Sequence, residues 1–309
     1  MEALWTSPSG IAFAEGGITA VGHATKGGCM DVKTYMHTGV TTVSPEALAN
    51  TAYQMMTLGE TRIRHLPVVL DDGTLIGIVT DRDLRRVGAS DAPSMSEHEL
   101  IYLLAKLRVR EVMTKEVVTV SGTTSVMHAG QLFLQKKFGC LPVVRENHTL
   151  EGIITVTDLL RAYVAQADAE HSVGVRSMVQ TQVVTASPTM SLADLQRLMG
   201  LNHIRHVPVV SGSHLVGMMT DRDLRDAIPS PATTLTRGEI AYRLETTPIK
   251  TCMTQELIWV GPEVTMVQAT RVLLQHTIGC LPIVDNGTLV GVVTDMDCVR
   301  AFLSTASGA

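Results

Sequence analysis

The sequence is poor in aromatic residues and has no long hydrophobic run. Phe, Trp and Tyr make up only 4% of its 309 residues, and Asp and Glu (30) outnumber Lys and Arg (25), which leaves a formal net charge of −5. Nucleic-acid surfaces usually combine a basic patch with stacking aromatics, so we expect no nucleic-acid partner. No apolar run approaches the roughly 18 residues of a membrane-spanning helix, and no basic segment opens a secretory signal. We therefore expect no membrane partner and a cytoplasmic location.

Cysteine pairs and common catalytic motifs are also missing. The five cysteines are widely spaced and form no C-x-x-C, which argues against a disulfide framework and a metal finger. Cys140 and Cys280 both stand in a G-C-L-P context, which predicts small buried hydrophobes. No G-x-S-x-G, H-E-x-x-H or P-loop occurs. We predict no catalytic residue, no bound metal of the protein's own, no catalytic cofactor and no enzyme activity.

The sequence does contain a fourfold internal repeat. Each copy has a strand-like segment around a proline, followed by glycine, two apolar residues and T-x-x-D. The prolines are Pro67, Pro142, Pro208 and Pro282, and the first-to-third and second-to-fourth separations are 141 and 140 residues. The duplicated unit is therefore a pair of repeats.

Each repeat predicts the element order β-α-β-β-α, a mixed α/β class. A β-branched run such as 117–120 precedes a helix signal, for example the Ser-Pro steps at Ser44 and Ser187, which we interpret as N-caps. Two short strands follow, joined by turn residues such as Asn286-Gly287. Within each pair an insert carries a capping box, at Ser96 to Glu99 and at Thr236 to Glu239, which predicts one further helix.

These motifs in this order resemble the cystathionine β-synthase (CBS) domain, which occurs in tandem pairs called Bateman modules. The resemblance covers about residues 31–306 and implies a disc-like, pseudo-fourfold arrangement, formed within one chain or through a homodimer. Domain boundaries are then a flexible tail at 1–29, a first module at 30–168 and a second at 169–309. The repeats are placed at about 30–88, 109–166, 172–228 and 248–306.

The T-x-x-D motif is the first candidate binding element. In nucleotide-binding CBS domains it holds the ribose, and a carboxylate at a helix amino terminus is suited to accept two hydrogen bonds from a vicinal diol. The alternative is that each aspartate only caps its helix. The candidate residues are Thr80 with Asp83, Thr155 with Asp158, Thr220 with Asp223, and Thr294 with Asp297.

Basic residues near these motifs are candidates for phosphate contacts. Arg64-His65 and Arg205-His206 stand just before the proline-bearing strand, where related adenine-nucleotide sensors carry a basic pair. The second and fourth repeats have Gly-Cys there, so we expect unequal sites within each pair. Arg82 and Arg222 could assist, or could be solvated arginines on a helix surface.

The resemblance implies a non-enzymatic regulatory protein. It would bind an adenosine-type nucleotide (AMP, ADP or ATP), with or without Mg²⁺, in clefts between repeats and signal to an effector protein by a change of shape or assembly. Two alternatives stay open. One is a scaffold or oligomerisation module that needs no ligand, and the other is a sensor of an S-adenosyl compound or a dinucleotide.

Overall fold

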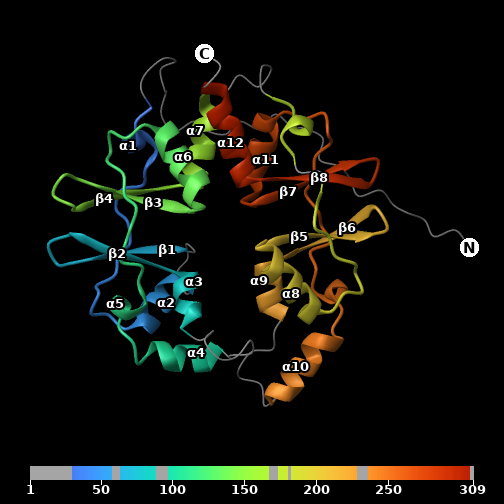
Figure 1. Ribbon diagram of the computed structural model, residues 1–309, viewed down its shortest axis with the longest axis horizontal. Coiled ribbons are helices and arrows are strands. Elements are labelled where there is room, and N and C mark those ends of the chain that lie inside the picture. The colour runs from blue at the N-terminus through green and yellow to red at the C-terminus, as the bar shows by residue number, and fades with distance from the viewer. Residues whose placement is uncertain are drawn as a thin grey trace, which may run out of the picture. The chain divides into compact units, whose positions relative to one another are not determined.

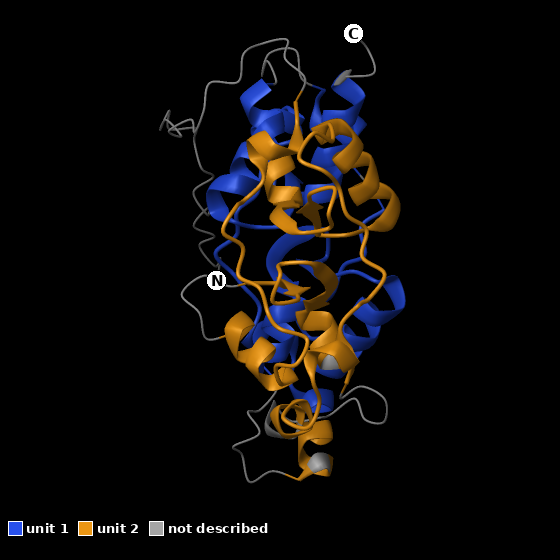
Figure 2. Ribbon diagram, turned by 90° about the vertical axis from the view of Figure 1, so that its left-hand side faces the viewer, with its two compact units in different colours: residues 1–28, 160–227, 244–309 blue, residues 29–159, 228–243 orange. Residues whose placement is uncertain are grey.

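A computed structural model describes residues 30–57, 63–87, 97–166, 173–179, 182–227 and 236–306. The expected tail at 1–29 and most of the expected module boundary, at 167–172, lie outside these residues. Figure 2 colours two compact units. Unit 2 holds the described residues of 29–159 and 228–243, and unit 1 holds those of 160–227 and 244–309.

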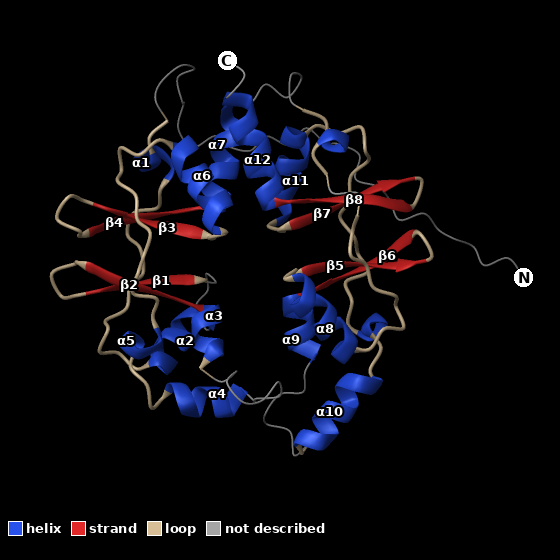
Figure 3. Cartoon of the chain, viewed as in Figure 1, coloured by secondary structure: helices blue, strands red, loops and turns tan. Residues whose placement is uncertain are grey.

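Every repeat is built on one antiparallel hairpin. Its proline, on the first strand, faces the residue directly after the glycine of the second strand, as Pro67 faces Ile78. Figure 3 shows the four hairpins as pairs of red arrows beside their helices. The turn at Asn286-Gly287 has positive φ at both residues (48° and 80°), as expected of a tight hairpin turn. The hairpins are β1 (His65–Val69) with β2 (Leu75–Thr80), β3 (Cys140–Val144) with β4 (Leu150–Thr155), β5 (His206–Ser211) with β6 (His214–Thr220), and β7 (Cys280–Asp285) with β8 (Thr288–Thr294).

The two hairpins of a pair meet at their turn ends. In unit 1, β6 and β8 pair through His214 and Thr288 to give the strand order β5-β6-β8-β7. In unit 2, Thr74 and Thr149 form the equivalent isolated bridge between the hairpins β1–β2 and β3–β4. A repeat alone is small, and this edge-to-edge pairing joins two of them.

One helix precedes and one follows each hairpin, and in Figure 1 they share one side of it. The four preceding helices are α2 (Ala49–Thr57), α6 (Val126–Lys136), α8 (Leu192–Asn202) and α11 (Met266–His276). The four that follow are α3 (Asp81–Arg86), α7 (Val156–Gln166), α9 (Asp221–Ala227) and α12 (Asp295–Ala306). Short turns of helix, α1 (Val32–Tyr35), α5 (Val109–Val112), η1 (Val175–Ser177) and η2 (Ile249–Thr251), open the repeats.

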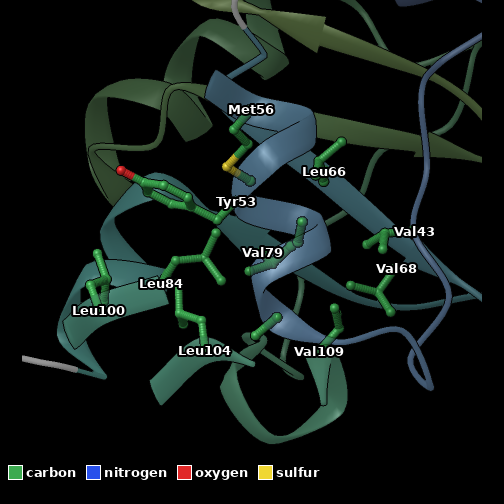
Figure 4. Packing of buried hydrophobic residues seen from close by; sticks show 12 residues of the cluster. Val43, Tyr53, Met56, Leu66, Val68, Val79, Leu84, Leu100, Leu104 and Val109 are labelled. Carbon is green, nitrogen blue, oxygen red and sulfur yellow. The ribbon is translucent and has the colours of Figure 1, made fainter. Parts of the chain in front are cut away.

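The core of the first repeat shows how these elements pack. Figure 4 shows side chains of α2, of the hairpin and of the following helix, among them Tyr53, Val79 and Leu84, which belong to one buried cluster. Leu66, Val79 and Leu84 are completely buried. Burying a side chain of this size stabilises by roughly 1.5–3 kcal/mol, so the core fixes the helix that carries the T-x-x-D aspartate.

The loops that open the first, second and fourth repeats cross to the neighbouring repeat of their pair. Thr114 exchanges two backbone hydrogen bonds with Ile78 of β2, and His37 does the same with Ile153 of β4. The methionine that precedes each of these loop residues fills the space that a Cβ on the facing glycine would need. The pairs are Met36 on Gly152, Met113 on Gly77 and Met253 on Gly217. These methionines therefore pack closely against the backbone of the facing strand.

Two local predictions are wrong in detail. The expected strand at 117–120 is a single parallel bridge from Val120 to Val143, because the chain turns at Ser121 before a second residue can pair. The Ser-Pro steps at Ser44 and Ser187 do not start a helix. After Ser44 the helix α2 begins only at Ala49, because Leu48 first forms a bridge to Arg108. The cap of α8 is Ser191, whose Oγ accepts from the Asp194 N–H, since Ser191 first forms an extended bridge to Pro248.

The insert helices are present in both pairs, as α4 (Glu97–Leu104) and α10 (Arg237–Thr246). The predicted capping box at Thr236 is confirmed, because Glu239 accepts from the Thr236 N–H at 2.7 Å and returns its own N–H to Thr236 Oγ1. Ser96 of the other capping box lies outside the described residues. Over the described ranges, no helix has both the length and the apolar character needed to cross a membrane.

Candidate functional site

The four T-x-x-D motifs fold identically. The threonine N–H and hydroxyl both donate to Oδ2 of the aspartate three residues later, at the start of the following helix. The N–H and hydroxyl distances are 3.0 and 2.5 Å at Asp83, 2.9 and 2.7 Å at Asp158, 2.7 and 2.8 Å at Asp223, and 2.9 and 2.6 Å at Asp297. Each threonine directly precedes its helix, and the aspartate three residues later caps the helix as the acidic residue of a capping box does. Any role in ligand binding depends on the other oxygen, Oδ1.

In the second and fourth repeats Oδ1 is already occupied. His37 Nε2 lies 2.9 Å from Asp158 Oδ1, and the ring donates because an ionised carboxylate only accepts. Arg300, one turn further along α12, donates to Asp297 Oδ1 at 2.7 Å. Asp158 is 2% exposed and Asp297 5%, so neither oxygen faces solvent. Pairing is what a buried carboxylate needs to remain charged.

In the first and third repeats Oδ1 is open. Asp83 and Asp223 are partly exposed, and among the described residues each carboxylate bonds only to its own threonine, Thr80 or Thr220. The fourth repeat's opening loop comes close, since the charge of Asp223 adds to burial in raising the pKa of the Cys252 thiol. These two carboxylates keep an acceptor for an added molecule.

The predicted arginine and histidine pairs divide by exposure. Arg64 and Arg205 are exposed, whereas His65 and His206 are partly buried. Each histidine lies against the glycine of the Gly-Cys step in the other repeat of its pair: a Cβ added at Gly139 would stand 3.2 Å from the His65 ring, and one at Gly279 would stand 3.3 Å from the His206 ring. The glycines therefore make room for the histidines.

Those glycines also lead to the next T-x-x-D helix. The Gly139 carbonyl accepts from the N–H of Val156, the first residue of α7, and the Gly279 carbonyl accepts from that of Asp295, the first residue of α12. Each histidine thus lies between the two T-x-x-D motifs of its pair.

Arg82 and Arg222 do not join these groups. Both are exposed on the helices that follow the first and third hairpins. Within the described ranges neither makes an ion pair with a protein carboxylate. The structure therefore places them on the solvated helix surface, where they could contact only an added anion.

The remaining candidate groups are the cysteines and the side chains that could bind a metal ion. Cys140 and Cys280 are buried, as predicted, and burial raises the pKa of each thiol to about 12. Cys298, on α12, behaves in the same way. In the described ranges, no three His, Cys, Asp or Glu side chains gather closely enough to hold a metal ion.

Surface hollows lie away from these carboxylates. One of about 520 Å³ lies at the start of α8, beside Met190 and Leu201. Another of about 310 Å³ lies between Val120 and His148. Neither is lined by a T-x-x-D residue, so the candidate site is defined by its polar groups and not by these hollows.

His37 and Arg300 are the residues that the sequence prediction missed. Arg300 could have been found, because it follows Asp297 at helical i,i+3 spacing. His37 lies 121 residues before Asp158. The only signal for it is that histidine follows the methionine of this opening loop, whereas the other three loops read Met113-Thr114, Met178-Val179 and Met253-Thr254.

Comparison with protein families identifies the class. The CBS domain model matches four times, at residues 32–90, 109–165, 175–230 and 249–304. The chain therefore belongs to the CBS-domain family, with four repeats in two Bateman modules, and its hairpins and flanking helices are the α/β repeats that the sequence predicts.

Individual relatives extend this result. An uncharacterized protein of Methanocaldococcus jannaschii is 28% identical over 271 residues, which are 85% of this chain and 95% of the relative. Its crystal structure, described as that of a candidate archaeal homolog of g-AMPK, has a TM-score of 0.70 at 24% identity and covers 88% of this chain and 100% of that one. This likeness shows the fold.

A match to an enzyme is partial. The inosine-5'-monophosphate dehydrogenase of Bifidobacterium longum is 27% identical over 194 residues, which are 62% of this chain but only 31% of the enzyme. The similarity thus leaves most of that enzyme unmatched.

Proposed function

We propose that this chain is a non-enzymatic regulatory protein that binds an adenosine-type nucleotide between the CBS repeats of a pair. The observation that carries the proposal is the open Oδ1 of Asp83 and Asp223, each at the amino terminus of a helix. A ribose diol can donate to this oxygen, and the positive end of the helix favours the charged carboxylate. Charge-assisted hydrogen bonds of this kind contribute roughly 1.5–3 kcal/mol each.

The neighbouring histidines supply the second half of the proposed site. In the hairpin register, His65 pairs with Thr80 and His206 pairs with Thr220, so each ring stands beside a T-x-x-D motif. A nucleotide whose ribose binds the aspartate would have its phosphates within reach of these rings and of the exposed Arg64 and Arg205. Mg²⁺ would arrive with the phosphates, as part of the ligand.

Signalling follows from the way the pair is built. A ligand shifts an equilibrium only as far as it binds two arrangements unequally. The proposed site is made from two repeats, because His65 of the first repeat lies against Gly139 of the second. A nucleotide bound there would favour the arrangement that holds both parts together and would report its presence through the altered surface to an effector protein.

Thermal unfolding tests the proposal. The full chain, freed of metal, is heated with AMP, ADP, ATP, S-adenosylmethionine and GTP, each with and without Mg²⁺. A ligand at 100 times its dissociation constant stabilises by about 2.7 kcal/mol, which raises the midpoint by several degrees. We expect a shift with adenine nucleotides. A shift only with the S-adenosyl compound would favour the alternative sensor, and no shift with any ligand would refute nucleotide binding.

A ligand-independent assembly role is the second candidate, because the two insert helices expose the same aromatic residue. Tyr102 of α4 is 61% exposed and Tyr242 of α10 is 70% exposed, and both follow the capping-box glutamate by three residues. Exposed tyrosines are common in protein interfaces. Replacing both with serine should leave the thermal shifts unchanged, and it should weaken self-association only if this second role is correct.

A further inference from the structure

In the second repeat, a side chain of the protein itself, that of His37, lies on the T-x-x-D carboxylate. Asp158 Oδ2 takes the N–H and hydroxyl of Thr155, and Oδ1 takes the His37 ring at 2.9 Å. Asp158 is 2% exposed, whereas the His37 side chain is 58% exposed. The ring therefore covers the carboxylate from the solvent side, where a ligand would have to approach.

The backbone fixes His37 in this place. Its N–H donates to the Ile153 carbonyl at 2.9 Å, and its carbonyl accepts from the Ile153 N–H at 3.0 Å. The preceding Met36 packs on Gly152, where a Cβ would collide with it. Two backbone hydrogen bonds and the packed Met36 thus hold His37 opposite Ile153, two residues before Thr155 on β4.

The first repeat offers a matched comparison. Thr114 is bonded to Ile78 of β2 in the same two-way manner, at 2.9 and 3.0 Å. Its side chain is shorter than an imidazole, and within the described residues it makes no hydrogen bond to Asp83. The backbone frame is shared, and the two loops differ in whether the side chain at this position reaches the carboxylate of the facing repeat.

We propose that His37 closes the second-repeat site, so that the first CBS pair takes its nucleotide at Asp83 and not at Asp158. This inference rests on the proposed function. At this loop position, the histidine ring hydrogen-bonds to the carboxylate of the facing repeat, and the threonine of the other loop does not. His37 is a specificity-determining residue of the pair.

Counting bound nucleotide tests this directly. Equilibrium dialysis of the full chain with labelled AMP and, separately, ATP gives the number of sites in wild type, H37T and T114H. Two of the three other opening loops carry threonine at this position, as Thr114 and Thr254, so H37T is a conservative way to remove the ring. We expect H37T to bind one nucleotide more than wild type and T114H to bind one fewer. H37T/D158N should return to the wild-type number, since Asn keeps an acceptor for the helix cap but loses the charge.

The outcomes separate this inference from the function it rests on. Equal numbers in wild type and H37T, with binding otherwise intact, would overturn the closure of Asp158 while nucleotide binding stands. An extra site in H37T that persists in H37T/D158N would also overturn it. No binding of AMP or ATP to any variant would refute the proposed function and the inference together. Circular dichroism of each variant confirms that the counts compare folded proteins.

Discussion

The odd repeats and the even repeats share one backbone design but differ around the T-x-x-D carboxylate. In the first and third repeats Asp83 and Asp223 are partly exposed and each retains an open oxygen. In the second and fourth, Asp158 and Asp297 are buried and both of their oxygens are engaged. The T-x-x-D motif alone therefore does not define a binding site. The same motif leaves one carboxylate oxygen open in the odd repeats and has it hydrogen-bonded within the protein in the even repeats.

The two even repeats engage the carboxylate oxygen by different routes. Arg300 lies on the same helix as Asp297, so its contact is local, and 53% of its side chain is exposed. His37 comes from another repeat and is held by backbone bonds. A local, exposed arginine can turn away at small cost, whereas moving His37 would require its loop to leave β4.

The even repeats also place cysteine where the odd repeats place histidine. Burial raises the pKa of Cys140 and Cys280 to about 12 from a usual value near 9.0. The thiolate is the reactive form, so at pH 8 these thiols should react with iodoacetamide roughly 1,000-fold more slowly in the folded protein than in urea. Mass spectrometry of labelled peptides measures this, with the partly exposed Cys252 as the control. Rapid labelling of Cys140 in the folded chain would contradict the buried assignment.

Loss of the open carboxylates should have the next largest effect. In D83N/D223N the caps keep an acceptor, but the charged partner of the ribose is gone. At roughly 1.5–3 kcal/mol for each charge-assisted bond, nucleotide affinity should fall by about 100-fold, as measured by calorimetry. D158N is the matched control in an even repeat and should leave affinity within about twofold. An equal loss in both variants would remove the distinction between odd and even repeats.

The smallest effect is expected at the exposed arginines. R82A/R222A should change the free energy of unfolding by less than about 0.5 kcal/mol, because surface substitutions away from packed or paired groups are usually this mild. Urea denaturation measures it. If these side chains also reach phosphate, ATP affinity should fall several-fold while adenosine affinity is unchanged. A large loss of stability would show that they have a structural partner.

Much of the fold could be predicted from the sequence because its signals are local and repeated. The period of Pro67, Pro142, Pro208 and Pro282 predicts four repeats, Asn286-Gly287 predicts its hairpin, and T-x-x-D predicts a helix start. The helix start at Ser187 was wrong because the bridge from Ser191 to Pro248 delays the helix, and this bridge joins distant segments. A tertiary contact overrode a local signal there.

The candidate site divides in the same way. Thr80 with Asp83, and its three counterparts, could be predicted from one chain segment each. Which of these carboxylates keep an open oxygen could not be predicted, because the contact on Asp158 comes from His37, which is distant in sequence. The unequal sites expected from Arg-His against Gly-Cys stay a prediction. The structure shows that Gly139 makes room for the His65 ring, and that the residue on the second-repeat carboxylate is His37.

A crystal structure of the full chain grown with AMP tests the central claim most directly. The account predicts ribose bound to Oδ1 of Asp83 and of Asp223, with the His37 ring still bonded to Asp158. Ribose at Asp158 with His37 displaced, while Asp83 and Asp223 remain empty, would contradict it.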